Sequence, residues 1–205
     1  MRRPVVVIGG GTSGCTVAAL LAATTTREIV LVESGNTSTH DDEPRFMDVI
    51  SEHNTSPFVM VGLVEGGIAV PYVQAHALGG GSAVNGMILS GEPPTSIEGL
   101  TRLAQPEEMG SVSRALLAAG GAPSRLWWNG GRWNPGRAVQ HLVEEGRISI
   151  VKQDVALLTG NSGAVQEVHT EHSVIAADHV VMCAGAIATP TLLLSSGMGA
   201  VNPQI

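Results

Sequence analysis

The feature that most constrains the fold of this chain is a glycine-rich turn between two apolar segments near its start. Residues 4–8 (Pro-Val-Val-Val-Ile) predict a strand buried on both faces. Gly-Gly-Gly-Thr-Ser-Gly follows at 9–14, and the small-residue segment 15–23 predicts a helix. Residues 28–33 (Glu-Ile-Val-Leu-Val-Glu) predict a second buried strand. This order of elements indicates a right-handed β-α-β unit with parallel strands over residues 1–35.

The glycines of this turn have the spacing G-x-G-x-x-G, and each has a physical role. Gly9 allows the tight turn, Gly11 lets the backbone approach a pyrophosphate, and Gly14 lets the helix pack closely on the strand. The helix begins near Thr12 and Ser13, where its free N–H groups and its dipole stabilise phosphate charge. The turn therefore predicts a phosphate-binding loop.

An acidic residue stands where a dinucleotide site needs one. Glu33, followed by Ser34, ends the second strand roughly 20 residues after the turn. Its carboxylate can accept hydrogen bonds from both ribose hydroxyls of an adenosine, and its charge disfavours the 2′-phosphate of NADP. We therefore predict a dinucleotide site rather than a plain tight turn with Glu33 on a solvated edge. The motif does not distinguish FAD from NAD.

Composition excludes several classes of protein. With 43% hydrophobic and 14% charged residues, the chain is no bulk disordered polypeptide, and its net charge of −7 argues against nucleic acid or an anionic membrane as partner. No run approaches the ~20 apolar residues of a membrane span, and the first apolar run is too short for a signal peptide, so we expect a cytoplasmic protein. Cys15 and Cys183 favour two buried thiols over a disulfide or a zinc site.

Between the first unit and residue 136 the pattern is weaker. Residues 36–70 contain a polar loop at 41–44 and show no clear period. Residues 71–91 centre on a second glycine cluster, and 92–136 form a reduced insertion. Within it, Ser111 to Ala119 predicts a helix with Ser111 as N-cap. All three tryptophans of the chain lie within 127–133, where they could form a lid, a core patch or an interface.

Residues 137–199 predict a helix, a β-meander, a last strand and a last helix. We expect these at 137–145 (helix), 148–151, 155–159 and 165–172 (meander strands), 178–186 (buried strand) and 191–195 (helix opened by Pro190). Residues 1–205 are therefore expected to form a single α/β domain in which a parallel sheet with helices is joined by a β-meander.

Two further segments resemble the signatures of a known family. Residues 78–87 (Leu-Gly-Gly-Gly-Ser-Ala-Val-Asn-Gly-Met) are similar to the first signature of the glucose–methanol–choline (GMC) flavoprotein oxidoreductases. Residues 185–199 (Gly-Ala-Ile-Ala-Thr-Pro-Thr-Leu-Leu-Leu-Ser-Ser-Gly-Met-Gly) are similar to the second. With the turn at 9–14, the motifs occur in the family's order. The resemblance implies a Rossmann-like FAD-binding fold and disfavours an NAD-dependent dehydrogenase.

The resemblance also implies cofactor contacts for the matching segments. The second glycine cluster would run under the flavin and its diphosphate, the strand at 155 would pair with the adenine edge, and the turn at 184–185 would lie beside the diphosphate. Covalent members carry a His at the position of Val84, so non-covalent FAD is implied. The contacts implied in this way are Gly80, Ser82, Asn85, Gly86, Met87, Ile88, Val155, Ala184 and Gly185.

The resemblance does not supply a catalytic residue. In GMC enzymes a His from a later segment, with a second His or an Asn, acts as base while hydride passes to the flavin. Six residues follow Gly199, and no histidine falls in a matching motif; the histidines are His40, His53, His76, His141, His169, His172 and His179. His169 and His172 would point to opposite faces of a strand, so no metal site is expected.

The expected function follows from these segments together. The resemblance implies a GMC-type oxidoreductase that transfers hydride from the CH–OH group of a small-molecule alcohol to FAD. The substrate domain would be largely absent, and a second subunit or another segment would supply the catalytic His. The alternatives are a non-catalytic FAD-binding module or accessory subunit and, less favoured, an NAD-dependent dehydrogenase. A hydrolase with Ser82 as nucleophile lacks the G-x-S-x-G context.

Overall fold

The computed structural model of the chain describes residues 2–37, 49–50, 55–62, 66–91, 100–161 and 163–199. The polar loop expected at 41–44, the histidines at 40 and 53 and residues 92–99 of the expected linker lie outside these described residues. None of the helices in the described part of the chain combines the length and the hydrophobicity that a bilayer crossing requires.

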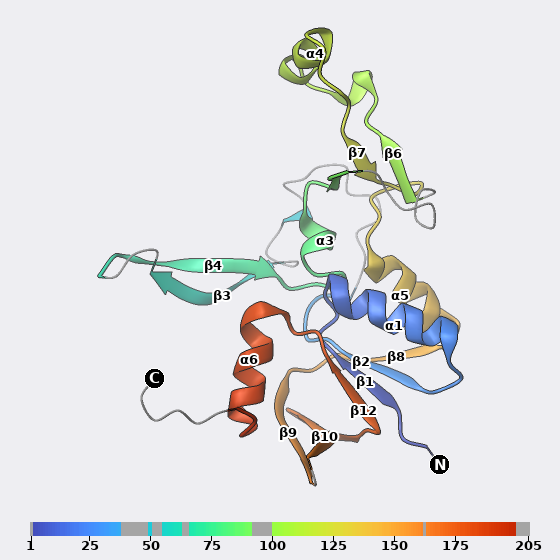
Figure 1. Ribbon diagram of the computed structural model, residues 1–205, viewed down its shortest axis with the longest axis vertical. Helices are drawn as coiled ribbons and strands as arrows, with labels where there is room; N and C mark the ends of the chain where they lie inside the picture. Colours follow the sequence, from blue (N-terminus) through green and yellow to red (C-terminus); the bar gives the residue numbers. More distant parts are fainter. Residues whose placement is uncertain are drawn as a thin grey trace.

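A four-stranded parallel sheet lies at the centre of the molecule (Figure 1). Its strands, in spatial order, are β12 (His179–Met182), β1 (Val5–Ile8), β2 (Ile29–Val32) and β8 (Ile148–Val151). Every residue of β1 and β2 is buried, as their continuous β-branched runs predict for strands covered on both faces. The β-α-β unit and the parallel sheet are thus confirmed.

Helices cover one face of this sheet. The helices α1 (Thr12–Thr24) and α5 (Pro135–Glu144) lie side by side there (Figure 1). Side chains alternate along β1, so Val5 and Val7 pack beneath these helices against the buried side chains of Cys15 and Ala18. The small residues of α1 let the helix lie close to the strands.

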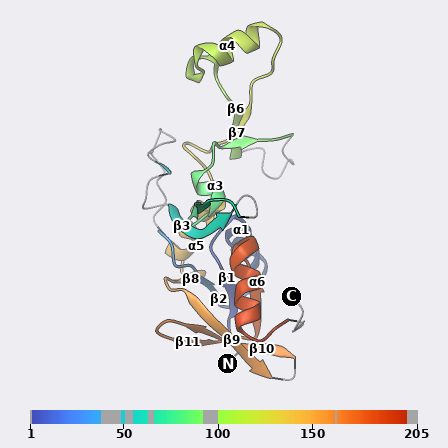
Figure 2. The same ribbon diagram turned by 90° about the vertical axis from the view of Figure 1, so that its left-hand side faces the viewer.

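A second, antiparallel sheet and a helix cover the opposite face. The sheet consists of β9 (Val155–Asn161), β10 (Ala164–Thr170) and β11 (Val174–Ala176) in the order β11-β10-β9. The helix α6 (Gly185–Ser195) lies in front of the parallel sheet in Figure 2. Val6 and Ile8 of β1 enter this second core, which Leu158, Val168 and Leu192 complete.

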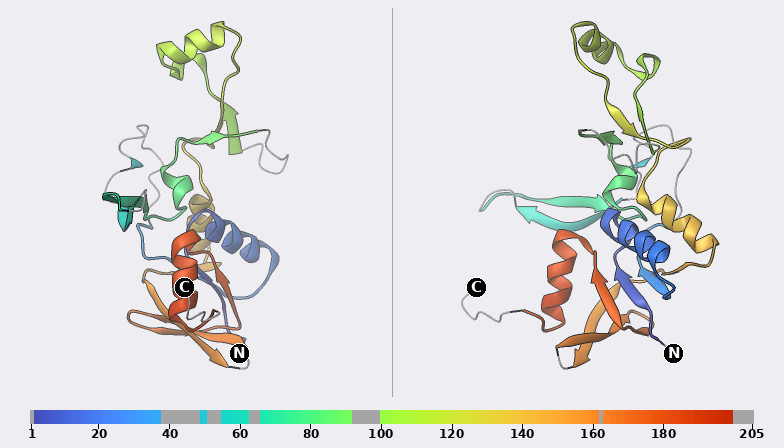
Figure 3. Two further views of the ribbon diagram at one scale, coloured as in Figure 1. Left: turned by 60° about the vertical axis from the view of Figure 1, so that its left-hand side comes forward. Right: turned by 45° about the vertical axis from the view of Figure 1, so that its right-hand side comes forward.

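Two parts extend away from this body (Figure 3). One is the antiparallel hairpin of β3 (Thr55–Gly62) and β4 (Ala69–Ala75). The other contains β5 (Ile88–Leu89), β6 (Thr101–Leu103), a 3-10 turn at Pro106–Glu108, α4 (Ser111–Ala118) and β7 (Arg125–Trp127), with strand order β5-β7-β6. We call the part from Thr101 to Trp127 the outlying module. The short helix α3 (Gly81–Val84) leads from the body to β5.

The β-meander exists, but it contains other strands than predicted. Residues 148–151 form a parallel strand beside β2, and the meander consists of β9, β10 and β11 instead. The reason is that α5 carries the chain back across the sheet, so the next strand joins β2 in the parallel direction. Lys152-Gln153-Asp154 then leads from one sheet to the other.

Two boundaries differ from the predictions, and one hairpin was not predicted. The last helix begins at Gly185 rather than at 191, so Pro190 lies inside α6. Gly110, not Ser111, is the N-cap of α4, because the backbone of Gly110 is still extended. The hairpin of β3 and β4 was not predicted at all, since β4 is exposed along most of its length and contains Pro71, which an edge strand tolerates.

Candidate cofactor site

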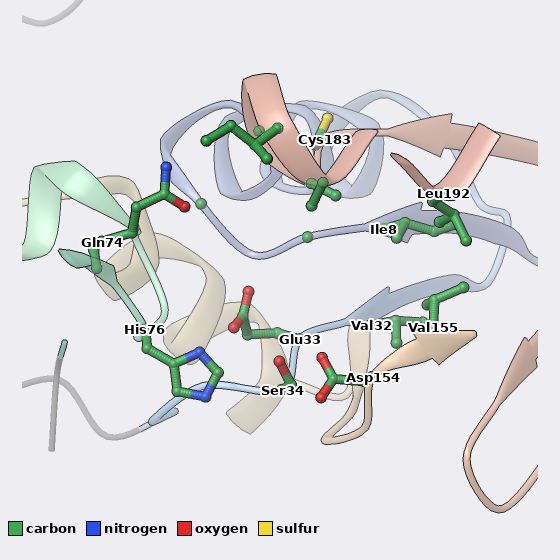
Figure 4. A pocket seen from close by; sticks show the side chains of 18 of the residues that line it. Ile8, Val32, Glu33, Ser34, Gln74, His76, Asp154, Val155, Cys183 and Leu192 are labelled. Atoms are coloured by element: carbon green, nitrogen blue, oxygen red, sulfur yellow. The ribbon is translucent and has the colours of Figure 1, made fainter. Parts of the chain in front are cut away.

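The carboxyl ends of the parallel strands open into one cavity of about 890 Å³ (Figure 4). This volume lies in the range of roughly 300–1,000 Å³ that is typical of small-molecule sites. The chain leaves β1 into α1 on one face of the sheet and leaves β12 into α6 on the other. Adjacent strands whose connections diverge in this way form a crevice, and open α/β sheets bind ligands there.

The glycine turn at 9–14 lines the cavity and has the geometry that its spacing predicts. Gly9 has φ +93°, and a Cβ there would lie 2.5 Å from the carbonyl oxygen of Cys183. A Cβ at Gly14 would overlap with the carbonyl oxygen of Gly9, so α1 packs directly on the turn. At Gly11, in contrast, a Cβ would meet no protein atom within 4 Å. Gly11 is thus the glycine of this turn whose open side faces the cavity.

The second glycine cluster is hydrogen-bonded to the first. Gly79 N–H donates to the carbonyl of Gly10 (2.7 Å), and Thr12 Oγ1 donates to the carbonyl of Gly79 (3.0 Å). Gly80 has φ +55°, and a Cβ there would lie 2.7 Å from Gly11 Cα. Two segments far apart in sequence therefore form one continuous backbone wall, which a side chain at Gly80 would push apart.

Glu33 is held at the end of β2 by the backbone. Its Oε2 accepts from Gly10 N–H (2.6 Å), and its Oε1 accepts from Gly35 N–H (2.7 Å). Each carboxylate oxygen keeps a second acceptor position for a ligand hydroxyl. In Figure 4 the side chains of Ser34 and Asp154 lie close to Glu33, and His76 stands at the same end of the cavity.

The structure brings most of the predicted cofactor residues to this cavity and leaves the others outside. Those that line it are Gly9, Gly11, Thr12, Ser13, Glu33, Ser34, Gly80, Val155, Ala184 and Gly185. Gly14 lies beneath the turn, and Ser82 Oγ donates to the carbonyl of Gly79 (2.6 Å) instead of facing the cavity. Residues 85–88 follow α3 and do not line the cavity either.

Residues 85–88 form an exposed turn of unusual backbone geometry. Asn85 Oδ1 accepts from Met87 N–H (2.9 Å), and Met87 adopts φ +62°, in the left-handed region that a non-glycine residue seldom occupies. Asn85 and Gly86 are exposed, and Ile88 is 64% exposed. Strained backbone of this kind concentrates at functional sites.

Several residues that line the cavity had not been predicted as site residues. Gln153 and Asp154 follow β8, so the strand pattern at 148–151 was the signal that could have found them. Tyr72, Gln74 and His76 come from β4 and the residue after it, and no sequence signal pointed to that hairpin. The helix α6 adds a last group, Ile187, Ala188, Thr191, Leu192 and Ser195.

The two cysteines are free thiols in different surroundings. Cys15 is buried and its Sγ donates to the carbonyl of Gly10 (3.0 Å); burial raises the pKa of Cys15 to about 12. Cys183 lines the cavity and is only partly buried, so the prediction of two buried thiols was wrong for this residue. Burial raises the pKa of Cys183 as well. Both thiols are therefore protonated at neutral pH, which makes them poor nucleophiles.

The histidines do not form a cluster in the described part of the chain. His169 contacts Thr159 Oγ1 (2.8 Å) and Glu167, whereas His172 is exposed beside Glu171. Of the histidines that the structure describes, His76 alone lines the cavity. It lies at the Glu33 end of the cavity (Figure 4).

Comparisons with known proteins identify the fold and a family similarity in the last part of the chain. A search of curated protein sequences finds no match. Among solved structures, pyridoxine 4-oxidase from Mesorbium loti superposes with a TM-score of 0.78 at 18% identity, covering 97% of this chain and 52% of that one. Aspergillus oryzae RIB40 formate oxidase gives 0.69 at 19% identity (97% and 48%). A FAD-dependent oxidoreductase from Chaetomium thermophilum gives 0.72 at 16% identity (96% and 48%).

These structures share the fold of this chain, which spans about half of their length. In sequence, residues 150–205 match the model of the GMC oxidoreductases. The matched segment contains β9 to β12 and the 185–199 signature. FAD is the cofactor of this family. Residues 150–205 are thus similar in sequence to the GMC oxidoreductases, and over nearly its whole length the chain shares the fold of FAD-dependent oxidoreductases.

Proposed function

We propose that this chain binds FAD non-covalently in an extended conformation and takes part in the oxidation of a CH–OH group of a small-molecule alcohol. The observation that carries the proposal is the joint wall of Gly11 and Gly80 at the carboxyl ends of β1 and β12, with Glu33 fixed at one end. Bound FAD would supply the acceptor for a hydride, and the residues described below would hold it.

The adenosine would lie at the Glu33 end of the cavity. Glu33 has free acceptor positions for the ribose hydroxyls because its backbone partners use only one position on each oxygen. Val155 and Leu192 offer apolar side chains to the adenine ring. Asp154 adds a second carboxylate beside Glu33, which strengthens the expected exclusion of a 2′-phosphate.

The diphosphate would lie over Gly11 and the start of α1. The first N–H groups of a helix have no partner within the helix, so those of Thr12 and Ser13 are available to phosphate oxygens. Among the described residues that line the cavity there is no Lys or Arg. Backbone N–H groups and the helix dipole would therefore stabilise the phosphate charge. Glycine at position 11 leaves the space over these N–H groups open to a phosphate, and glycine at position 80 lets the second segment pack against Gly11.

The flavin ring would extend from Gly80 past α3 to residues 85–88. Exposure of Asn85, Gly86 and Ile88 leaves this surface free to receive a ring. Val84 offers no nucleophile for a covalent link to the flavin. The base that takes the alcohol proton would come from another segment or from a second subunit, since His76 lies at the adenosine end.

A second candidate function is FAD binding without turnover, as a module or accessory subunit. The observation that favours it is that His76, which among the described histidines alone lines the cavity, lies at the Glu33 end, where the adenosine would bind. Alcohols are added to the FAD-loaded chain without oxygen. Bleaching of the visible flavin band would overturn the non-catalytic module, whereas an unchanged band would show that this chain does not oxidise these alcohols by itself.

FAD binding itself is tested on the purified chain by titration with FAD, with NAD as competitor. We expect retention of the visible flavin band through gel filtration and no displacement by NAD. A chain that retains no flavin would contradict both candidate functions. Displacement of flavin by NAD at comparable concentration would instead favour the dehydrogenase alternative.

A further inference from the structure

Arg132 is a buried cation outside the cofactor cavity. Its side chain comes from the segment between β7 and α5 and is only 6% exposed. Nη1 donates to the carbonyl of Asn85 (2.7 Å) and, at 3.4 Å, to that of Ala83. Nε has no hydrogen-bond partner, and within the described part of the chain no carboxylate pairs with the guanidinium. Burial lowers the pKa of Arg132.

Burial of this guanidinium lowers the stability of the folded chain. A buried charge without a counter-ion loses hydration that backbone carbonyls replace only in part, and the orphaned Nε adds a further penalty. An apolar side chain of similar length would fill the same space at lower cost. What the guanidinium provides instead is a fixed link to two carbonyls at the end of α3, one on each side of Val84.

The same segment holds the turn at 85–88 at a second point. Trp127 N–H donates to the carbonyl of Met87 (2.9 Å), and Ile88 pairs with Leu126 between β5 and β7. Trp127 is stacked on Trp133 with ring centroids 5.3 Å apart. The backbone of Trp127 therefore holds this turn, while its ring packs on that of Trp133.

The two anchor points bracket the part of the turn that is strained and open. Arg132 holds the carbonyl of Asn85, Trp127 holds that of Met87, and Gly86 between them is exposed. Met87 keeps its left-handed φ only while contacts with neighbouring residues hold the backbone in this conformation. Without the guanidinium, one of the two carbonyls that fix this conformation is released.

We propose that Arg132 is a positioning residue that fixes the backbone of Asn85, Gly86 and Met87 in the conformation that receives the flavin ring. It does so from outside the cavity, through the carbonyls of Ala83 and Asn85. This inference rests on the proposed function, because it takes residues 85–88 as the flavin surface. It adds a requirement that lies in the segment before α5, where no cofactor contact was predicted.

The test compares Arg132→Met and Arg132→Lys with the unsubstituted chain. We expect Arg132→Met to weaken FAD binding roughly tenfold to hundredfold, the loss expected of a charge-assisted hydrogen bond. Bound flavin should also be less quenched in fluorescence and show an altered visible circular dichroism spectrum. Arg132→Lys keeps the charge without the fork and should lie between the two. The melting temperature without FAD reports any purely structural effect separately.

Arg102→Met is the matched control. Arg102 also has a guanidinium in ordered contacts, over the ring of Trp128 (4.3 Å) and paired with Glu108, yet none of these contacts reaches residues 79–88. We expect this variant to bind FAD as the unsubstituted chain does, with the same flavin spectra.

Each outcome decides the inference. Wild-type affinity and unchanged flavin spectra in folded Arg132→Met overturn it, while the proposed function stands. If Arg132→Met does not fold, Arg132→Lys decides in the same way: unchanged affinity and spectra overturn the inference, and weakened binding with altered spectra supports it. Failure of the unsubstituted chain to bind FAD overturns the proposed function first and this inference with it.

Discussion

The sequence predicts both α1 and α4 as helices, but the structure buries one side of α1 and leaves α4 without a buried residue. In α1 the side chains of Cys15, Ala18 and Ala22 are buried against the sheet, and Gly14 touches the turn before it. In α4 no residue is buried, and Val112 and Leu116 are 73% and 63% exposed. An isolated helix of this length is marginal in water. The comparison teaches that the cofactor side of the molecule is supported by its own core, whereas the outlying module is not.

The largest effect is expected at the contact between α1 and the glycine turn. In Gly14→Val the added side chain overlaps with the Gly9 carbonyl, so α1 must move from the sheet. We expect a loss of at least about 3 kcal/mol in the free energy of unfolding, measured by denaturant titration. A variant of wild-type stability would show that α1 is not held by this contact.

Gly11→Val should separate binding from stability. A Cβ at position 11 meets no protein atom, and the backbone there has φ −69°, which any residue adopts. We expect the free energy of unfolding to change by about 1 kcal/mol or less, with complete loss of FAD retention. Gly81→Ala, which also adds a Cβ into open space, is the control for stability. Normal retention by Gly11→Val would refute the phosphate-loop assignment.

Glu33→Ala should have a mixed effect. The substitution leaves the N–H groups of Gly10 and Gly35 without their acceptor and removes the proposed ribose partner. We expect a loss of about 1–3 kcal/mol in stability and FAD binding weakened roughly tenfold, measured by thermal denaturation and fluorescence titration. Glu33→Gln keeps one acceptor oxygen and should be milder in both. Equal affinity for FAD in all three proteins would remove Glu33 from the site.

The smallest effect is expected in the outlying module. Leu116→Ser on α4 should change the free energy of unfolding by no more than about 0.5 kcal/mol, because the side chain is already exposed. Leu31→Ala, its counterpart in the core of the parallel sheet, should cost about 2–5 kcal/mol. Denaturant titration of both variants measures the contrast. A loss above about 2 kcal/mol for Leu116→Ser would show that something covers α4 in solution.

The parts of the fold that could be predicted are those whose signals are local. The turn at 9–14, with a strand before it and a helix after it, determines its own geometry. The strand at 148–151 was recognised, yet its partner was not, because pairing with β2 depends on residues far away in the sequence. The error also hid Gln153 and Asp154, which reach the cavity only through that pairing.

The rest of the site escaped prediction for a different physical reason. The strand β4 is exposed on both faces over most of its length, so it lacks the alternation that marks a strand, and its contribution of Gln74 and His76 to the cavity went unseen. Arg132 has no motif at all. Its role depends on where the backbone carbonyls of α3 lie, and only the three-dimensional structure places them.

The position of β1 between β2 and β12 has a consequence for biosynthesis. Val5 pairs with His179, so β1 completes its hydrogen bonds only with β12, a strand that is synthesised long after it. Until then one edge of β1 stays open, and pairing across such a sequence separation is slow. Val6 and Ile8 likewise wait for Leu158 and Leu192 to cover them. A nascent chain therefore exposes one edge of β1 and part of its apolar surface until β12 and α6 have been made.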